Sequence, residues 1–128
     1  MMRRRLLQAA VVALPVIAAG LPAQSAGDAA RGATVYESLC AGCHALDENR
    51  FGPAHRGVFG RKAGSARDYD YSSALASSRV VWSEETLDRW LTNPEKFIAG
   101  QKMSVSVANE ADRRDVIAYL KAQPVKAR

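Results

Sequence analysis

Cysteine and histidine are scarce in this chain of 128 residues, which has two of each. They are Cys40, Cys43, His44 and His55. A disulfide-dense scaffold is thereby excluded, because such folds need several cysteine pairs. A structural zinc site needs four ligands and would have to use all four residues, two of which are neighbours that would not easily reach one tetrahedral ion together.

The chain also lacks an internal repeat, a low-complexity segment and a convincing β-hairpin pattern. There is no βαβ pattern around the cysteines, which argues against a thioredoxin-like dithiol. Helical patterns dominate instead. Short helical turns are expected at 72–78 and 93–97, and loops are expected at 47–67 and 101–108.

Three longer helices are predicted from their N-caps, which are Asp28, Ser83 and Asn109. The first and the last are the only long amphipathic ones, so we expect them to cross and to bury their apolar faces against each other. Gly32 is expected to allow this close approach, against an apolar side chain of the last helix. The predicted fold class is therefore all-α.

The N-terminal residues have the pattern of an export signal. Three arginines at 3–5 precede an apolar run at 6–20, and small residues follow. The run is too short and too interrupted for a stable membrane span. We predict a secretory signal peptide over 1–25, cleaved between 23 and 26, and a mature domain over 26–128 in the periplasm. A twin-arginine signal is the weaker alternative.

The basic charge of the chain is mostly a property of this leader. The whole chain has 18 basic and 13 acidic residues, a formal net charge of +5. Without the leader arginines, 15 basic and 13 acidic residues remain, a net charge of +2. The high isoelectric point is therefore no evidence for nucleic-acid binding, and we expect no nucleic-acid partner.

The segment Cys40-Ala41-Gly42-Cys43-His44 carries the most specific chemistry in the sequence. Two thiols at this spacing can each add to one vinyl group of a haem and form a thioether bond. The histidine that follows then lies under the ring, where an imidazole nitrogen can bind iron. A plain disulfide would make no use of His44. We therefore predict one covalently bound haem c.

A second axial ligand can be argued by elimination. Without the leader, Met103 is the only methionine, and His55 is the only histidine besides His44. Met103 lies in a predicted loop, whereas a methionine that only fills a core usually lies on an apolar helical face. His55 is expected to be a surface imidazole or one bonded to backbone. Lys96 and Lys102 would first have to lose a proton.

These motifs, in this order, resemble those of the class I c-type cytochromes of the mitochondrial-type branch, close to the soluble bacterial members. The resemblance implies the cytochrome c fold, in which the N- and C-terminal helices cross and one haem is covalently bound. The matching blocks span nearly the whole mature chain: 32–36, 40–44, 52–53, 57–64, 69–72, 82–87, 93–94, 100–103 and 115–120.

The resemblance also implies the roles of single residues. Cys40 and Cys43 match the attachment points, His44 the proximal iron ligand and Met103 the distal one. Pro53 matches the residue whose carbonyl accepts the other N–H of the proximal histidine. Three more residues match positions that hold a buried haem propionate, their alternatives being core aromatics and a surface arginine: Arg61, Tyr71 and Trp82.

The chain departs from the family pattern at three places near the predicted site. Arg56 stands directly before Gly57, where family members often carry histidine, and His55 precedes it. Trp90 replaces a tyrosine that is usual near the distal methionine, and residues 104–108 replace an aromatic- and glycine-containing stretch. These changes bear on partner docking and on the iron–sulfur bond.

The predicted function is one-electron transfer by a soluble periplasmic carrier, not an enzyme. With both axial positions filled, no open site remains for oxygen, peroxide or substrate. The expected partners are redox proteins, namely dehydrogenases, cytochrome complexes or oxidases, which a monomeric carrier would contact by transient docking. The alternatives are a peroxidase-like haem enzyme with a labile Met103, served by His55, and a tightly bound cytochrome subunit of a dehydrogenase or oxidase.

Overall fold

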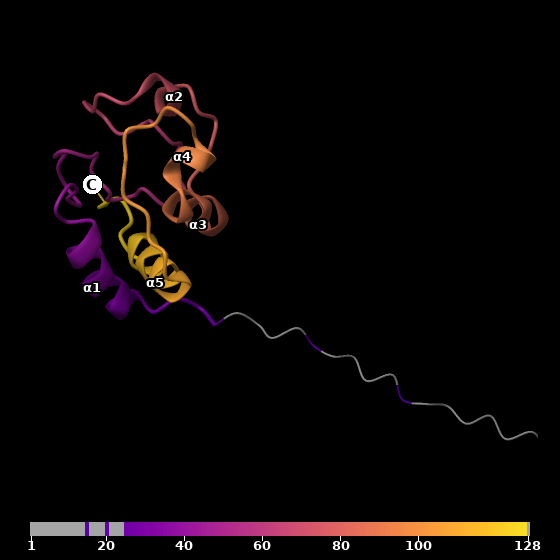
Figure 1. Cartoon of the computed structure of the whole chain (residues 1–128). Helices are drawn as coiled ribbons and strands as arrows, with labels where there is room; N and C mark the ends of the chain where they lie inside the picture. The colour runs from indigo at the N-terminus through magenta and orange to yellow at the C-terminus, as the bar shows by residue number, and fades with distance from the viewer. Residues whose placement is uncertain (1–14, 16–19, 21–24, 128) are drawn as a thin grey trace, which may run out of the picture.

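The computed structural model describes residues 15, 20 and 25–127 (Figure 1). Within this part, the only β pairing is an isolated antiparallel bridge between Lys62 and Val81. The all-α prediction is thus confirmed. The chain forms these helices: α1 (Ala29–Leu39), α2 (Ser73–Ala76), α3 (Glu84–Thr92), α4 (Pro94–Phe97) and α5 (Glu110–Lys121). The predicted signal peptide at 1–25 lies almost wholly outside the described residues and stays a prediction.

The longer helices begin at the predicted caps. The side chain of Asp28 accepts hydrogen bonds from the first turn of α1, and that of Asn109 does the same for α5. Ser83 and Thr86 form a reciprocal capping box at the start of α3. These bonds satisfy backbone N–H groups that have no partner within the helix, which is why the helices start where the sequence predicts. None of the described helices is long and apolar enough to cross a bilayer.

The crossing of α1 and α5 forms one end of the domain, drawn in purple and yellow in Figure 1. The expected role of Gly32 is confirmed: it allows the two helices to approach each other closely. A β-carbon at position 32 would collide with the backbone carbonyl of Asp115, and it would also touch the β-carbon of Tyr119. Glycine is therefore required at this crossing by contact with the main chain of α5 as well as with one of its side chains.

A substitution at this crossing should destabilise the whole domain. Gly32→Ala places a methyl group where the carbonyl of Asp115 lies, so the helices must separate. We expect a loss of about 3 kcal/mol and a fall in Tm of more than about 10 °C. Thermal unfolding followed by circular dichroism measures this. The matched control is Ala33→Leu on the exposed side of α1, which should change Tm little; equal effects at both positions would contradict the close crossing.

The remaining helices and the long loops complete the domain beyond this crossing. In Figure 1, α3 lies beside α5, α4 follows on the other side of α3, and α2 lies at the far end on the loops. Apolar side chains from α1, α3 and α5 meet in one core that also contains Trp82 and Val58. The largest members of the core are aromatic: Tyr36, Trp82 and Trp90.

The segment after α5 is tied back to the loop that follows the cysteines. Gly57 donates its N–H to the carbonyl of Gln123 at 2.7 Å, and Lys126 reaches Asp47 at 3.4 Å. Asp47 also accepts from the guanidinium of Arg56. This hydrogen bond from Arg56, together with the two cationic charges, lowers the pKa of Asp47 to about 2.

The ion pair of Asp47 with Arg56 should make a small contribution to the stability of the fold, and acid should remove it. The pKa of Asp47 is lower in the folded state than its unfolded value of about 3.9. The contribution is therefore complete above about pH 4 and is lost as the pH falls towards 2. We expect Tm of the wild type to exceed that of Asp47→Asn by a few degrees at most, since the pair is exposed. The gap should close between pH 4 and pH 2; a constant gap over this range would contradict the assignment.

Candidate functional site

A cavity of about 540 Å³ lies between the crossed helices and the long loops. This volume is within the range of sites that bind cofactor-sized molecules. The structure brings all the predicted site residues together on its wall: Cys40, Cys43, His44, Pro53, Arg61, Tyr71, Trp82 and Met103. These residues come from segments spread over most of the domain, so only the folded chain forms the site.

The end of α1 presents the two cysteines to the cavity. Cys40 caps the helix, and its carbonyl accepts the N–H groups of Cys43 at 3.0 Å and of His44 at 2.9 Å. The chain thus continues as a tight turn, and the two thiols are free rather than paired in a disulfide. Burial, with a smaller effect of Cys43, raises the pKa of Cys40 to about 11, so this thiol stays protonated at neutral pH.

The imidazole of His44 is held by the loop that follows it. Its Nδ1 lies 2.8 Å from the carbonyl oxygen of Pro53. Burial lowers the pKa of His44, and the bond to Pro53 opposes this only in part. The ring is therefore neutral at pH 7, with Nδ1 donating to the carbonyl and Nε2 carrying a free lone pair. That is the tautomer that a metal needs.

Gly52 lies directly against this imidazole. A β-carbon at position 52 would overlap the Cε1 side of the His44 ring. The N–H of Gly52 also donates to the carbonyl of Cys43 at 2.8 Å, which ties the loop to the cysteine turn. Glycine at this position therefore lets the backbone approach the ring closely enough for the neighbouring Pro53 carbonyl to reach Nδ1.

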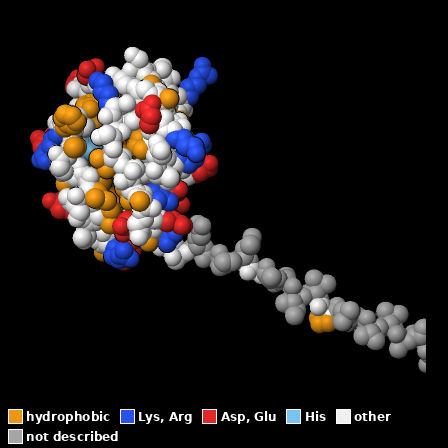
Figure 2. Space-filling view, viewed as in Figure 1, with side chains coloured by type: hydrophobic (Ala, Val, Ile, Leu, Met, Phe, Trp, Pro, Cys, Tyr) orange, Lys and Arg blue, Asp and Glu red, His pale blue; other side chains and the backbone are white. Residues whose placement is uncertain are grey.

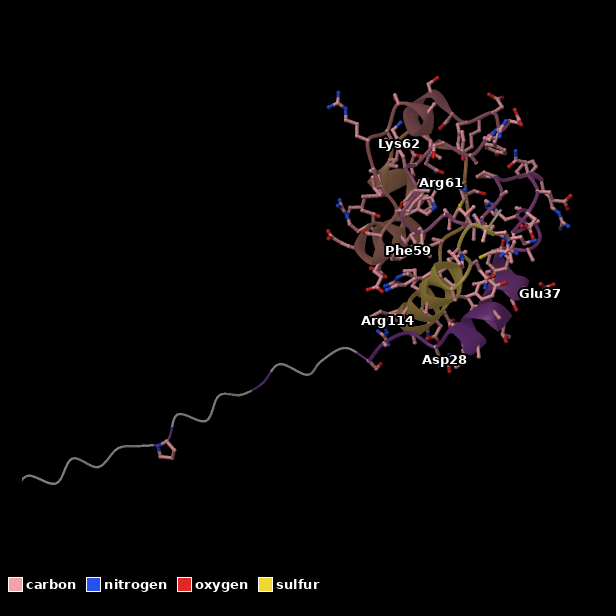
Figure 3. All side chains as sticks on the ribbon, turned by 180° about the vertical axis from the view of Figure 1, so that it is seen from behind. Asp28, Glu37, Phe59, Arg61, Lys62 and Arg114 are labelled. Atoms are coloured by element: carbon pink, nitrogen blue, oxygen red, sulfur yellow. The ribbon has the colours of Figure 1, made fainter. Side chains whose placement is uncertain are left out.

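Arg61 brings a cation to the inner wall of the cavity. Its side chain lies within the body of the domain in Figure 3, far from the charged residues of the helical end such as Asp28 and Arg114. It donates to the carbonyls of Ala54 at 3.0 Å and Arg56 at 3.5 Å. Its buried Nε has no hydrogen-bond partner among the described residues. Burial lowers its pKa, so the site disfavours this charge unless an anion joins it.

Two aromatic residues complete this polar corner. The hydroxyl oxygen of Tyr71 accepts the N–H of Ala66 at 3.0 Å, which leaves its own proton available to donate. Trp82 is buried on the cavity wall, with its ring 5.4 Å from that of Trp90. Trp90, which replaces the family's usual tyrosine, also lines the cavity. An arginine, a phenol and an indole thus line the same cavity, where they could bind a carboxylate.

A hydrogen-bond network shapes the loop that carries Met103. The carboxylate of Glu95 accepts the N–H of Gly100 at 2.9 Å and the side-chain amide of Gln101 at 3.3 Å. The amide oxygen of Gln101 in turn accepts the N–H of Met103. The roles of Glu95 and Gln101 are not predicted from the sequence. The only signal was the polar spacing of the loop, which does not show that these side chains bond to its backbone.

The position expected for His55 is wrong. It is neither a surface imidazole nor held by a backbone bond of its ring. Its ring stacks on that of His44 with centroids 3.9 Å apart and planes 17° apart, and its Nδ1 lies 3.1 Å from the hydroxyl of Tyr36. The loop folds back under the cysteine turn because the N–H of His55 bonds to the carbonyl of Ala45 at 3.0 Å.

Exposed apolar side chains lie at the cavity wall as well. Leu39, Phe51 and Val105 line the cavity and are 45%, 84% and 39% exposed. Figure 2 shows hydrophobic side chains gathered around a small area of histidine surface, with charges of both signs scattered over the rest of this face. The cavity therefore has an apolar opening through which an edge of a bound group would meet solvent or a partner.

These features together fit a haem rather than a metal ion alone. No group of three or more cysteine, histidine or carboxylate side chains able to hold a metal ion is present in the described part of the chain. Two free thiols, a neutral imidazole and a thioether instead surround a large apolar cavity, with an unpaired guanidinium nitrogen at one corner. These residues and this cavity define the class of protein: an all-α domain that holds a covalent haem.

Comparison with known proteins places the chain within this class. The family described as cytochrome c matches residues 29–124. The chain is 41% identical over 99 residues to cytochrome c of Gibberella zeae, covering 74% of this chain and 93% of that protein. It is 40% identical over 105 residues to cytochrome c 2.1 of Caenorhabditis elegans, covering 80% and 95%.

A solved structure agrees with these sequence comparisons. Cytochrome cH from Methylobacterium extorquens is similar with a TM-score of 0.72 and 39% sequence identity, covering 75% of this chain and 99% of that chain. The chain belongs to the cytochrome c family. It is an electron carrier that binds haem c covalently through Cys40 and Cys43, and it is not an enzyme.

Proposed function

We propose that the mature chain, residues 26–128, is a soluble periplasmic carrier of single electrons whose haem iron is ligated by His44 and Met103. The observation that carries this proposal is the neutral imidazole of His44, bonded to Pro53 and facing the same cavity as the thioether of Met103. When bound, the haem supplies a one-electron iron(III)/iron(II) couple. The residues of the chain would bind this haem and exclude water from it.

The residues of the cavity would perform three tasks. Cys40 and Cys43 would hold the group by thioether bonds, while His44 and Met103 would ligate its iron and leave no coordination site for substrate. Arg61, with Tyr71 and Trp82, neutralises and binds a propionate at the buried corner. The buried aromatic and aliphatic core excludes water, so little has to reorganise when the charge of the iron changes.

The position of His55 weighs against a peroxidase-like alternative. Such an enzyme needs an acid–base group at an open distal position, and His55 is the only histidine besides His44. Its ring lies against the proximal imidazole of His44 instead, and Tyr36 holds its Nδ1 there. If Met103 left the iron, the distal side of the haem would therefore have no histidine to transfer protons.

We expect transient docking with dehydrogenases, cytochrome complexes or oxidases through the apolar opening formed by Leu39, Phe51 and Val105. The net charge of +2 after removal of the leader would give only modest long-range attraction. A monomer suits this use, because one partner must leave before the next can bind.

The function is tested by an anaerobic reductive titration of the purified holoprotein. We expect one electron equivalent per chain, full reversibility and no turnover of peroxide. Mass analysis of protein from a periplasmic extract should show cleavage within 23–26 and the mass of one added haem. Uptake of two electrons, or sustained peroxide reduction, would overturn the proposal.

A further inference from the structure

We propose that His55 is a positioning residue for His44: its stacked ring, anchored by the Tyr36 hydroxyl, sets the orientation of the proximal imidazole and so contributes to the reduction potential. This inference rests on the proposed function, because it takes His44 as the proximal ligand. The resemblance does not predict this arrangement, which lies where the chain departs from the family pattern at His55 and Arg56.

The stack restricts His44 in a direction that the bond to Pro53 leaves free. The two imidazole centroids are 3.9 Å apart with planes 17° apart, which is closer than most aromatic pairs. The carbonyl of Pro53 holds Nδ1 in the ring plane at 2.8 Å. Rotation of the His44 ring out of this plane would drive it into the face of His55. One contact therefore fixes the tautomer and the other fixes the tilt.

Tyr36 connects His55 to the most rigid part of the fold. Its hydroxyl lies 3.1 Å from Nδ1 of His55, and the two rings meet edge to face at 5.6 Å and 68°. Tyr36 is only 5% exposed and packs on Tyr119 of α5 at 5.1 Å. The crossing of α1 and α5 thus fixes the orientation of the His44 ring through the side chains of Tyr36 and His55.

Tyr36 and His55 also satisfy each other's polar groups. The hydroxyl of Tyr36 lies 3.1 Å from Nδ1 of His55, where the phenol can donate to the imidazole nitrogen. A buried hydroxyl and a buried imidazole would each be costly alone, and here each satisfies the other. The stack consequently places a polar, polarisable ring beside the proximal ligand.

Four variants of the holoprotein separate positioning from simple packing. His55→Leu removes the stacked ring, His55→Phe keeps a flat ring without the hydrogen bond, and Tyr36→Phe removes only the anchoring hydroxyl. Tyr119→Phe is the matched control, since it deletes a hydroxyl at the same helix crossing without touching His55. The readouts are the ferric electron paramagnetic resonance spectrum, which reports the imidazole orientation, and the reduction potential.

We expect His55→Leu to change the ferric spectrum and to raise the potential, because an apolar side chain stabilises the extra positive charge of ferric iron less well. Tyr36→Phe should give a smaller change in the same direction, and His55→Phe should restore most of the spectrum. Tyr36→Phe should add nothing further in the His55→Leu background, because both act through one contact. Tyr119→Phe should leave both readouts at the wild-type values.

The inference and the proposed function fail in different ways. A His55→Leu protein that keeps covalent haem and resists carbon monoxide, with wild-type spectrum and potential, would overturn the inference alone. Should His55→Leu fail to hold haem, an unchanged spectrum in Tyr36→Phe would overturn it equally. Wild-type protein without covalent haem would overturn the function and the inference together, whereas a distal site that binds carbon monoxide readily would overturn the function alone.

Discussion

Replacing both Cys40 and Cys43 with serine is expected to abolish covalent haem attachment and to leave the domain largely unfolded. The thiols are the only groups on the cavity wall that can form thioether bonds. Without the group, the aromatic core faces a cavity of about 540 Å³. An unfilled core costs roughly 24 cal/mol per Å³. Even after discounting for the open side of the cavity, this loss is on the order of the whole stability of a small domain.

The measurements are a haem stain after denaturing electrophoresis and far-ultraviolet circular dichroism. The double variant should show no stain and little helix, while each single variant, with one thioether left, should retain part of both. The corresponding control is Ala41→Ser between the two cysteines, which adds a hydroxyl and keeps both thiols. A double variant with native helix content and cooperative unfolding would show that the fold does not depend on the attached group.

Met103→Ala is expected to open the distal position without loss of covalent haem. Met103 is the only thioether on the cavity wall, and the variant retains Cys40, Cys43 and His44. The ferric spectrum should change from low-spin to largely high-spin, and added imidazole or cyanide should then bind readily. Absorption titrations measure both effects. The reduction potential should fall as well, because the thioether favours ferrous iron.

The control for this variant lies two residues further along the same loop. Val105→Ala shortens a side chain that is 39% exposed on the cavity wall, and it should leave the ferric spectrum unchanged. A Met103→Ala protein that stays low-spin and refuses added ligands would mean that another group, such as a lysine, occupies the distal position.

Most of the fold could be predicted because its signals are local. A capping side chain bonds to backbone within three residues, so Asp28, Ser83 and Asn109 marked the starts of α1, α3 and α5 without knowledge of the rest of the fold. The predicted short helices and loops are confirmed for the same reason. The carbonyl of Asp115 as the nearest contact of Gly32 could not be predicted, because helix periodicity shows which face is buried but not which main-chain atoms lie opposite.

The same distinction between local and long-range signals applies to the residues of the site. The cysteine spacing and the lone Met103 carry chemistry that residue type alone reveals. The stack of His55 on His44, and its bond to Tyr36, depend on how a loop folds back under α1, and no periodic pattern encodes this. The bonds from Glu95 and Gln101 to the Met103 loop are of the same kind. Such contacts join polar side chains to sites that are close only in the folded chain.

The central claim is that His44 and Met103 close both axial positions of the haem in a one-electron carrier. The most direct test is to add carbon monoxide to the reduced wild-type protein and to record its absorption spectrum together with that of the ferric form. We expect a low-spin ferric spectrum with the signature of sulfur ligation, and a reduced spectrum that carbon monoxide leaves unchanged. Rapid and complete binding of carbon monoxide by the wild type would contradict it.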